Sequence, residues 1–304
     1  MEKKIHMVVH ENYKSVEDYL FSLQGVFFNK ILTLKNDIEI ISNLYNNGDY
    51  LIFICLSMDW DNFHPKQWLN SGRILFLNTE HLTNENRMNI IQKFIQLNIP
   101  ILDFSSTNIE IINNYLRLNN TTYEYTPLLI PYQLNTKELE YITTKKQSYE
   151  YDIGIIAAIP KAIDDDIVSN RTIIWNKLIK GKWKCLNING FGKERDEQIQ
   201  KCKIILNIHH FESFKIFEEI RCIRLILGDK VVISDKSYLD HLIDVHDLVV
   251  WTKHDKMLQT IDEVLNNFNM YQTKLENTNK DYINKSRQRI LEYSKNKILD
   301  SNKF

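Results

Sequence analysis

Residues 206–221 join an apolar run to a helical pattern through a polar and aromatic segment, LNIHHFESFKIFEEIR. The amphipathic spacing predicts a helix over 214–227, whose first turn would present unpaired backbone N–H groups and the positive end of a dipole. Such a helix start suits a diphosphate, and Lys215 and Arg221 could add positive charge beside it. Glu218 could accept hydrogen bonds from both hydroxyls of a ribose. These residue types in this order favour a site for a nucleoside diphosphate.

Plainer interpretations compete with this one. Glu218 and Arg221 are three residues apart, so they could simply pair on a solvated helix face. The adjacent His209 and His210 would point to opposite faces of an extended strand, and with no third ligand at a recognisable spacing they do not predict a zinc site. The sequence has no GxGxxG, Walker or GxSxG motif, which argues against a dinucleotide oxidoreductase, a P-loop ATPase and an α/β-hydrolase.

Short apolar runs alternate with helix-length amphipathic stretches along most of the chain. Strands are predicted at 5–9, 50–56, 73–78, 99–103, 152–157, 183–188, 203–208, 230–234 and 247–251. Helices are predicted near 15–30, 84–97, 107–117, 168–180, 193–201, 214–227 and 255–271. Strands separated by helices indicate βαβ crossovers and parallel sheets, which bind ligands at the C-terminal ends of their strands.

The alternating pattern is interrupted over 119–150, a polar stretch that holds two of the five prolines. We therefore expect an α/β protein with two Rossmann-like domains and a terminal helix. The N-terminal domain would cover 1–140, the C-terminal domain 141–272, and a basic helix 273–304.

The composition is that of a globular protein, with 43% hydrophobic and 25% charged residues in 304 and a formal net charge of −1. This balance gives no reason to expect nucleic-acid binding. No apolar run approaches the roughly 18 residues that a spanning helix needs. The four cysteines form no CxxC pair, so we expect reduced thiols and a cytoplasmic protein.

Several short stretches resemble motifs of one enzyme class when taken in chain order. They are NTEHL at 78–82, DFSSTN at 103–108, IPY at 130–132, YDIG at 151–154, Asn170-Arg171, and LNIHHFESFKIFEEIRCIRLILGDKVVISDKS at 206–237. Together they resemble short GT-B glycosyltransferases related to the group 1 and CgeB-like families, and the resemblance spans roughly residues 70–265.

The resemblance implies two Rossmann-like domains that face a central cleft, with a nucleotide-sugar held mainly by the C-terminal domain and an acceptor by the N-terminal one. The implied activity is transfer of a sugar from a UDP- or GDP-sugar to a hydroxyl of a glycan or small molecule, as in glycan biosynthesis, with no cofactor and no metal. The implied donor-binding residues are Arg171, His209, Ser213, Lys215, Glu218, Arg221 and Asp235.

An inverting reaction of this kind needs a base that deprotonates the acceptor hydroxyl, whereas a retaining one does not. Side chains at the ends of predicted N-terminal strands are the candidates, with Glu80, Asp103 and His10 foremost and Asp59 or Asp61 after them. Each of these side chains could instead hold its loop in shape, and a lone histidine is more often structural.

Two acidic clusters offer other chemistry. Asp59-Trp60-Asp61 has the Asp-x-Asp form by which GT-A glycosyltransferases hold a divalent metal. It comes after only two or three predicted strands, however, and a GT-A fold would leave the second α/β domain unexplained. Asp164-Asp165-Asp166 precedes a predicted helix, where acidic residues favour the dipole.

The sequence also departs from the family pattern. Many group 1 enzymes have a glutamate five residues before the glycine that closes the donor-site helix, whereas this chain has Ile223 before Gly228. Asp235 stands where relatives often have glutamate. These departures keep two alternatives open: a catalytically inactive GT-B-like binding module, and a nucleotide-sugar 2-epimerase on the same fold.

The basic segment 273–304 has two interpretations. An apolar stripe that includes Leu291, Tyr293 and Ile298 could place the helix on an anionic membrane surface. More often, a terminal helix packs back across another part of the protein.

Overall fold

The computed structural model describes residues 3–9, 16–54, 72–83, 85–134, 149–157, 169–211 and 214–300. The chain divides into two compact units. Unit 1 comprises Met1–Gln133 and Asn284–Phe304, and unit 2 comprises Leu134–Ile283. Each unit is built on a parallel sheet with helices, which confirms the expected α/β class.

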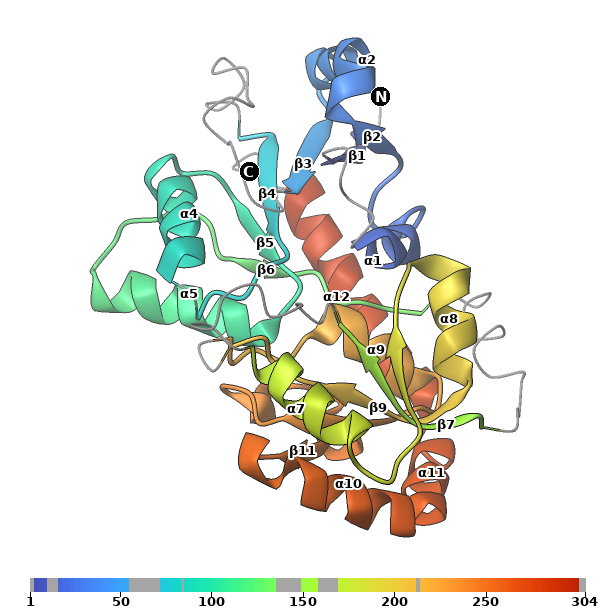
Figure 1. Cartoon of the computed structure of the whole chain (residues 1–304). Helices are drawn as coiled ribbons and strands as arrows, with labels where there is room; N and C mark the ends of the chain where they lie inside the picture. Colours follow the sequence, from blue (N-terminus) through green and yellow to red (C-terminus); the bar gives the residue numbers. More distant parts are fainter. Residues whose placement is uncertain are drawn as a thin grey trace. The chain divides into compact units, whose positions relative to one another are not determined.

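In the described part of the chain, the sheet of unit 1 has the strand order β2-β1-β3-β4-β5-β6, with all neighbours parallel (Figure 1). The strands are β1 (Ile5–Val9), β2 (Ile31–Thr33), β3 (Tyr50–Ile54), β4 (Ile74–Asn78), β5 (Ile101–Asp103) and β6 (Leu128–Leu129). The helices are α1 (Glu17–Leu23), α2 (Leu34–Asn46), α4 (Glu85–Gln96) and α5 (Ser106–Leu118). Every residue of β1, β3, β4 and β5 is buried, as expected for strands covered on both faces.

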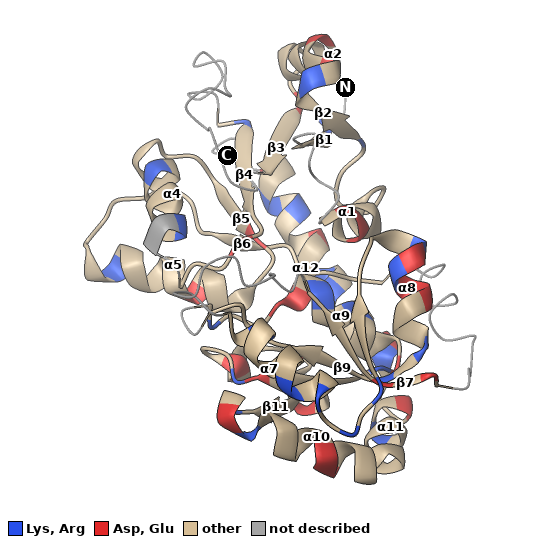
Figure 2. Cartoon of the chain, in the orientation of Figure 1, with Lys and Arg blue, Asp and Glu red and all other residues tan. Residues whose placement is uncertain are grey.

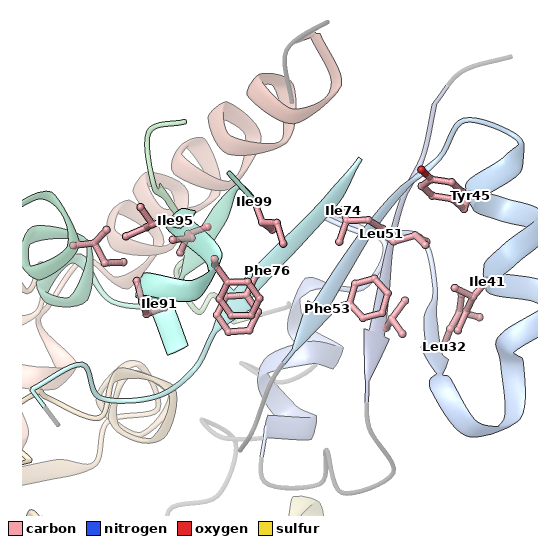
Figure 3. Close-up of a cluster of buried hydrophobic side chains, with 14 of the residues drawn as sticks. Leu32, Ile41, Tyr45, Leu51, Phe53, Ile74, Phe76, Ile91, Ile95 and Ile99 are labelled. Carbon is pink, nitrogen blue, oxygen red and sulfur yellow. The ribbon is translucent and has the colours of Figure 1, made fainter. Parts of the chain in front are cut away.

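Aromatic and branched side chains fix the helices of unit 1 to this sheet. Phe76 of β4 stacks on Phe94 of α4, with ring centroids 3.9 Å apart. On the neighbouring strand, Phe53 faces Leu32 and Ile41, the latter from α2 (Figure 3). Burying each such side chain contributes roughly 1.5–3 kcal/mol, so these contacts determine where α2 and α4 lie.

The last helix, α12 (Lys280–Asp300), carries several Lys and Arg residues (Figure 2) and completes unit 1. Arg287 donates to the carbonyl of Tyr132 (2.9 Å), and Ser294 donates to that of Leu129 (2.9 Å). Leu291 is also buried, as is Ile298. The part of this segment from residue 284 on therefore packs within unit 1, and two members of its apolar stripe are not available to a membrane surface.

Unit 2 contains a second parallel sheet in the order β11-β10-β9-β7-β8; β7, β9 and β11 are labelled in Figure 1. Its strands are β7 (Tyr151–Ile156), β8 (Cys185–Ile188), β9 (Cys202–Asn207), β10 (Val231–Asp235) and β11 (Val250–Thr252). Its helices are α7 (Asn170–Ile179), α8 (Gly192–Gln200), α9 (Glu219–Leu227), α10 (Met257–Asn266) and α11 (Phe268–Glu276), with short 3₁₀ turns η3 (Asp240–Leu242), η4 (His246–Leu248) and η5 (His254–Lys256).

The centre of this second sheet is too tightly packed to admit a side chain on Gly154 of β7. A Cβ there would lie 2.6 Å from Ile188 and 2.8 Å from both Cys202 and Ile205. Any larger residue would require these three side chains to shift, which favours a glycine in the middle of this buried strand.

Some predicted elements differ from the observed ones. The helix predicted over 214–227 begins at Glu219, because Ile216 and Phe217 are buried from a non-helical segment that precedes it. The stretch 255–271 forms two helices, α10 and α11, and the helix predicted over 15–30 is the shorter α1. The pattern predicted neither α2 nor the short strands β2 and β6.

No helix within the described ranges is both long enough and apolar enough to cross a lipid bilayer.

Candidate functional site

The carboxylate of Glu218 lies between two guanidinium groups at the C-terminal edge of the unit 2 sheet. Arg171 Nη2 is 2.8 Å from Glu218 Oε1, and Arg221 Nη2 is 2.5 Å from Oε2. Glu218 immediately precedes α9, Arg221 lies in the first turn of that helix, and Arg171 lies in the first turn of α7. Three residues from two separate helices therefore converge on one point.

The end of β9 positions both arginines. Arg171 Nε donates to the carbonyl of Ile208 (2.7 Å), just beyond the last residue of the strand. Arg221 Nη1 donates to Oδ1 of Asn207 (3.2 Å), and the buried Asn207 amide in turn donates to Ser234 on β10 (3.0 Å). The orientation of each guanidinium is thus set by backbone or by a side chain fixed within the sheet.

The charges of this cluster do not balance. Two guanidinium groups surround one carboxylate, and the three side chains are only 12%, 23% and 15% exposed for Arg171, Arg221 and Glu218. Burial, and after it the charge of Arg221, lower the pKa of Arg171 from its usual value, while Glu218 opposes this shift. Among the three side chains in direct contact, two positive charges face one negative charge, and an anion could relieve the repulsion between the two guanidinium groups.

Both guanidinium groups also have N–H donors that their contacts with described residues do not use. A guanidinium has five N–H donors in a planar fork. Arg171 uses Nε and Nη2, and Arg221 uses Nη1 and Nη2, for the contacts made with described residues. The remaining N–H groups could hold phosphate oxygens in the bidentate manner typical of arginine.

The helix starts, by contrast, offer few free backbone donors. At α9 the Glu219 N–H is bonded to Phe217 and that of Arg221 to Glu218, and the two adjacent carboxylates would repel an anion. At α7 the N–H of Asn170 is bonded to the His210 carbonyl and that of Arg171 to Ser169 Oγ. Anion binding here would therefore depend on the arginine side chains, and not on the helix start that the sequence pattern predicted.

His210 lies beside this cluster although it was not among the predicted donor-binding residues. Its Nδ1 is 2.8 Å from Oγ of Ser169, the residue that caps α7. Its ring packs on Phe211 (centroids 4.0 Å apart) and is stacked with Phe214 (6.4 Å). Burial, followed by the positive charge of Arg171, lowers the pKa of His210 below its usual 6.5.

His209 and Asp235 form a second buried group at the same strand edge. The backbone N–H of His209 donates to Asp235 Oδ2 (3.2 Å), and its Nε2 is 3.2 Å from the Ile216 carbonyl. Asp235 Oδ1 lies 3.8 Å from His254 Nδ1, and neither of these two buried atoms has a hydrogen-bond partner in the described structure. Burial raises the pKa of Asp235, and the nearby histidines partly offset this. These contacts hold the loop after β9.

The other predicted donor-site residues contribute less or fall outside the described residues. The side chain of Lys215 is exposed, and its carbonyl accepts from the Tyr238 N–H. Ser213 lies outside the described residues, as do His10, the Asp59-Trp60-Asp61 motif and the Asp164–Asp166 cluster.

In unit 1, Asp103 and Asn108 tie together the loops that follow β4 and β5. The fully buried Asp103 carboxylate accepts hydrogen bonds from Asn78 Nδ2 (2.7 Å), Asn108 Nδ2 (2.9 Å) and the Ser105 N–H (2.9 Å). Both amides also donate to the Glu80 carbonyl (2.9 Å each). A buried carboxylate saturated in this way fits the loop-holding role considered for it, because it cannot reach a hydroxyl substrate.

The Glu80 side chain is more accessible than that of Asp103. It is 26% exposed and lies 3.4 Å from Arg87. Of the base candidates in the described part of unit 1, Glu80 is therefore the one that solvent can reach.

Sequence reasoning missed Ser169, Asn207, His210 and His254. Ser169 carried a usable signal, since serine is a preferred N-cap and it precedes the predicted helix of Arg171. The described residues contain no group of three or more His, Cys, Asp or Glu placed to hold a metal ion.

No protein-family model matches the chain. It is 29% identical over 289 residues to the uncharacterized protein L138 of Acanthamoeba polyphaga mimivirus, a match that covers 88% of this chain and 30% of L138. It is also 29% identical over 269 residues to the uncharacterized protein L140 of the same virus, covering 85% of this chain and 78% of L140. A third mimivirus protein, R358, also uncharacterized, is 26% identical over 215 residues, which is 69% of each chain. The chain thus spans less than a third of L138 and most of L140.

Proposed function

We propose that this protein is a glycosyltransferase that moves a sugar from a UDP- or GDP-sugar to a hydroxyl group of a glycan or small molecule, without an essential metal. The observation that carries the proposal is the placement of Glu218 between Arg171 and Arg221 at the C-terminal edge of a parallel sheet. Ligands of open α/β sheets bind at this edge.

The chemistry of the three side chains matches the parts of such a donor. The guanidinium groups would bind the diphosphate and stabilise the charge that it gains as the sugar leaves, which is the task that a metal performs in other enzymes. Glu218 would accept hydrogen bonds from the ribose hydroxyls. A GT-B-like arrangement, in which unit 1 binds the acceptor, is part of the same proposal; it is supported by the presence of a separate parallel sheet in each unit.

The first test is isothermal titration calorimetry with UDP, GDP, UDP-glucose and GDP-mannose. We expect Arg221→Ala and Arg171→Ala to weaken binding by roughly ten- to hundredfold, as is typical for loss of a charge-assisted hydrogen bond. Lys182→Ala is the matched control, because it removes the same charge from unit 2 at an exposed pair with Asp262 just before β8, at the opposite edge of the sheet.

The second test isolates the ribose contact. The wild-type protein should bind UDP more tightly than 2′-deoxy-UDP, and Glu218→Gln should reduce that preference because the amide replaces one acceptor oxygen by a donor. Equal affinity of wild type and all three site variants for every nucleotide would refute the donor assignment.

One observation favours the alternative of an inactive, nucleotide-binding module. Ile223, which stands in place of a family glutamate, is fully buried in α9, so this position cannot supply a catalytic carboxylate. The two functions are separated by donor turnover. A glycosyltransferase releases UDP or GDP when donor and acceptor are both present, or slowly by hydrolysis, whereas the module binds the same nucleotide-sugar and releases nothing.

A further inference from the structure

We propose that His210 is a third diphosphate-binding side chain of this site and that it takes up a proton when the diphosphate binds. The inference rests on the proposed function, since it requires the arginine cluster to hold a diphosphate. The resemblance places the loop 209–213 beside the donor, and the inference adds a specific diphosphate contact and a proton-coupled step at one residue of that loop.

The position of the imidazole is fixed on one side only. Ser169 Oγ lies 2.8 Å from Nδ1, and the same hydroxyl accepts from the backbone N–H of Arg171. The Arg171 guanidinium itself donates to the carbonyl of Ile208, two residues before His210. Phe211 and Phe214 fix the plane of the ring. Nε2, on the far side, makes no hydrogen bond to any residue that the structure describes, and His210 is only half-buried. This nitrogen is therefore the atom that a ligand could reach.

The charged groups around the ring determine its protonation. Arg171 on α7 repels a proton on His210, whereas Glu218 attracts one, and burial disfavours the charged form most of all. Arg221 on α9 adds a second positive charge on the opposite side of Glu218. In the ligand-free protein these effects keep the pKa below 6.5, so the ring is neutral at pH 7.

A bound diphosphate reverses this balance. Its two negative charges would compensate Arg171 and Arg221 and would favour the charged imidazole, which raises the pKa of His210 in the complex. Between the pKa of the free protein and that of the complex, binding therefore consumes up to one proton. Over that interval affinity rises as pH falls, by as much as tenfold per pH unit.

The experiment measures the enthalpy of UDP-glucose and GDP-mannose binding at pH 7 in buffers that differ in ionisation enthalpy. These diesters are suitable probes because, unlike UDP or GDP, their diphosphate has no proton to gain or lose between pH 6 and 8. For the wild type we expect proton uptake and an affinity that rises from pH 8 to pH 6. For His210→Gln we expect no uptake and an affinity that changes less than twofold over this range.

His246→Gln is the matched control, since it removes a histidine near the start of β11, at the opposite edge of the same sheet, and should leave the proton uptake unchanged. If His210→Gln fails to fold, the imidazole C–H resonance of His210 in the wild type gives the same answer, because it should shift to its protonated position on addition of UDP-glucose at pH 7. Binding without proton uptake, or uptake that persists in His210→Gln, would overturn the inference and leave the proposed function intact. Failure of every nucleotide to bind would overturn both.

Discussion

At the scale of single residues, the site is defined by an imbalance of charge. Glu218 can satisfy two guanidinium groups geometrically, but it neutralises only one of them. Elsewhere in unit 2, Asp196 forms a bidentate pair with the buried Arg224 and also lies 3.3 Å from Arg195, so it too contacts two guanidinium groups. What distinguishes the Glu218 cluster is its place at the C-terminal edge of the parallel sheet, where open α/β sheets bind ligands.

Asp235 offers a prediction about stability and pH. Burial raises its pKa above the ordinary 3.8, so the charged carboxylate at neutral pH lowers the free energy of unfolding. Asp235→Asn removes that charge, retains an acceptor for the His209 N–H and can donate to His254. We expect the variant to be more stable than wild type by about 1 kcal/mol at pH 7, measured by urea unfolding.

The sign of the pH dependence follows from the direction of this shift. An acid whose pKa is raised by folding destabilises the protein fully above the folded pKa and not at all below the unfolded one. The advantage of Asp235→Asn should therefore shrink as pH falls towards 4. An advantage that is constant with pH would show that the Asp235 charge is not its cause.

Residue roles were only partly predictable from the sequence. Glu218 and Arg221 stood out by type and spacing, and Arg171 by resemblance. Asn207 could not be assigned, because it acts through Ser234, which lies far away in the chain. The N-cap role of Ser169 could be predicted from the sequence, but its contact with His210 could not. Such contacts depend on strand order, which local patterns do not encode.

At the scale of elements, the site depends on how α7 begins. Ser169 caps this helix through the Arg171 N–H and also contacts the carbonyl of His210, while Asn170 donates to that carbonyl. The first turn of α7 is thereby attached to the loop after β9. The position of the Arg171 guanidinium beside Glu218 therefore depends on these contacts between the start of α7 and the loop after β9.

Ser169→Ala should test this attachment. Loss of an N-cap costs about 1 kcal/mol, and we expect a loss of this size in urea unfolding together with weaker nucleotide binding, since Arg171 and His210 both lose an anchor. Ser42→Ala, on the exposed face of α2 in unit 1, removes a hydroxyl of the same type that bonds only to a helix carbonyl, and it should change neither quantity. Unaltered binding by Ser169→Ala would show that Arg171 is held in place by its contact with Ile208 alone.

The strands were the elements best predicted from the sequence, because continuous apolar runs such as IHMVV and YLIFI have no stable place other than a covered sheet. Helix α2 was missed because Ile38 and Ile40 are exposed and blur the periodicity. The start of α9 was misplaced because Ile216 and Phe217 fit a helical stripe equally well, and only the packing of unit 2 shows that they are buried from a non-helical segment.

At the scale of the whole molecule, the sequence order and the spatial order of the chain differ. Unit 2 is inserted between two parts of unit 1, and α12 supplies the second part. The terminal basic segment could be predicted as a helix from its pattern. Its partners near Leu129 and Tyr132 could not, because more than 150 residues separate them in the chain.

Leu291→Ala tests the contribution of α12. Leu291 is 1% exposed, and its truncation should cost about 2–5 kcal/mol in the stability of unit 1, measured by thermal and urea unfolding. Tyr293→Ala, on the same helix but 57% exposed, should cost much less. Nucleotide affinity should stay the same in both variants, because the residues proposed to bind the donor belong to unit 2. A loss of affinity in Leu291→Ala under conditions where the protein is folded would contradict that separation.

The return of α12 to unit 1 has a consequence for biosynthesis. A ribosome finishes β1 to β6 early, but it must then translate the whole of Leu134–Ile283 before the helix that covers them emerges. At typical elongation rates this delay is about 10 to 30 s, during which the binding surface for Leu291 and Ile298 is bare. The nascent N-terminal sheet therefore lacks its covering helix during this delay, whereas unit 2, whose segments are contiguous, can complete its folding first.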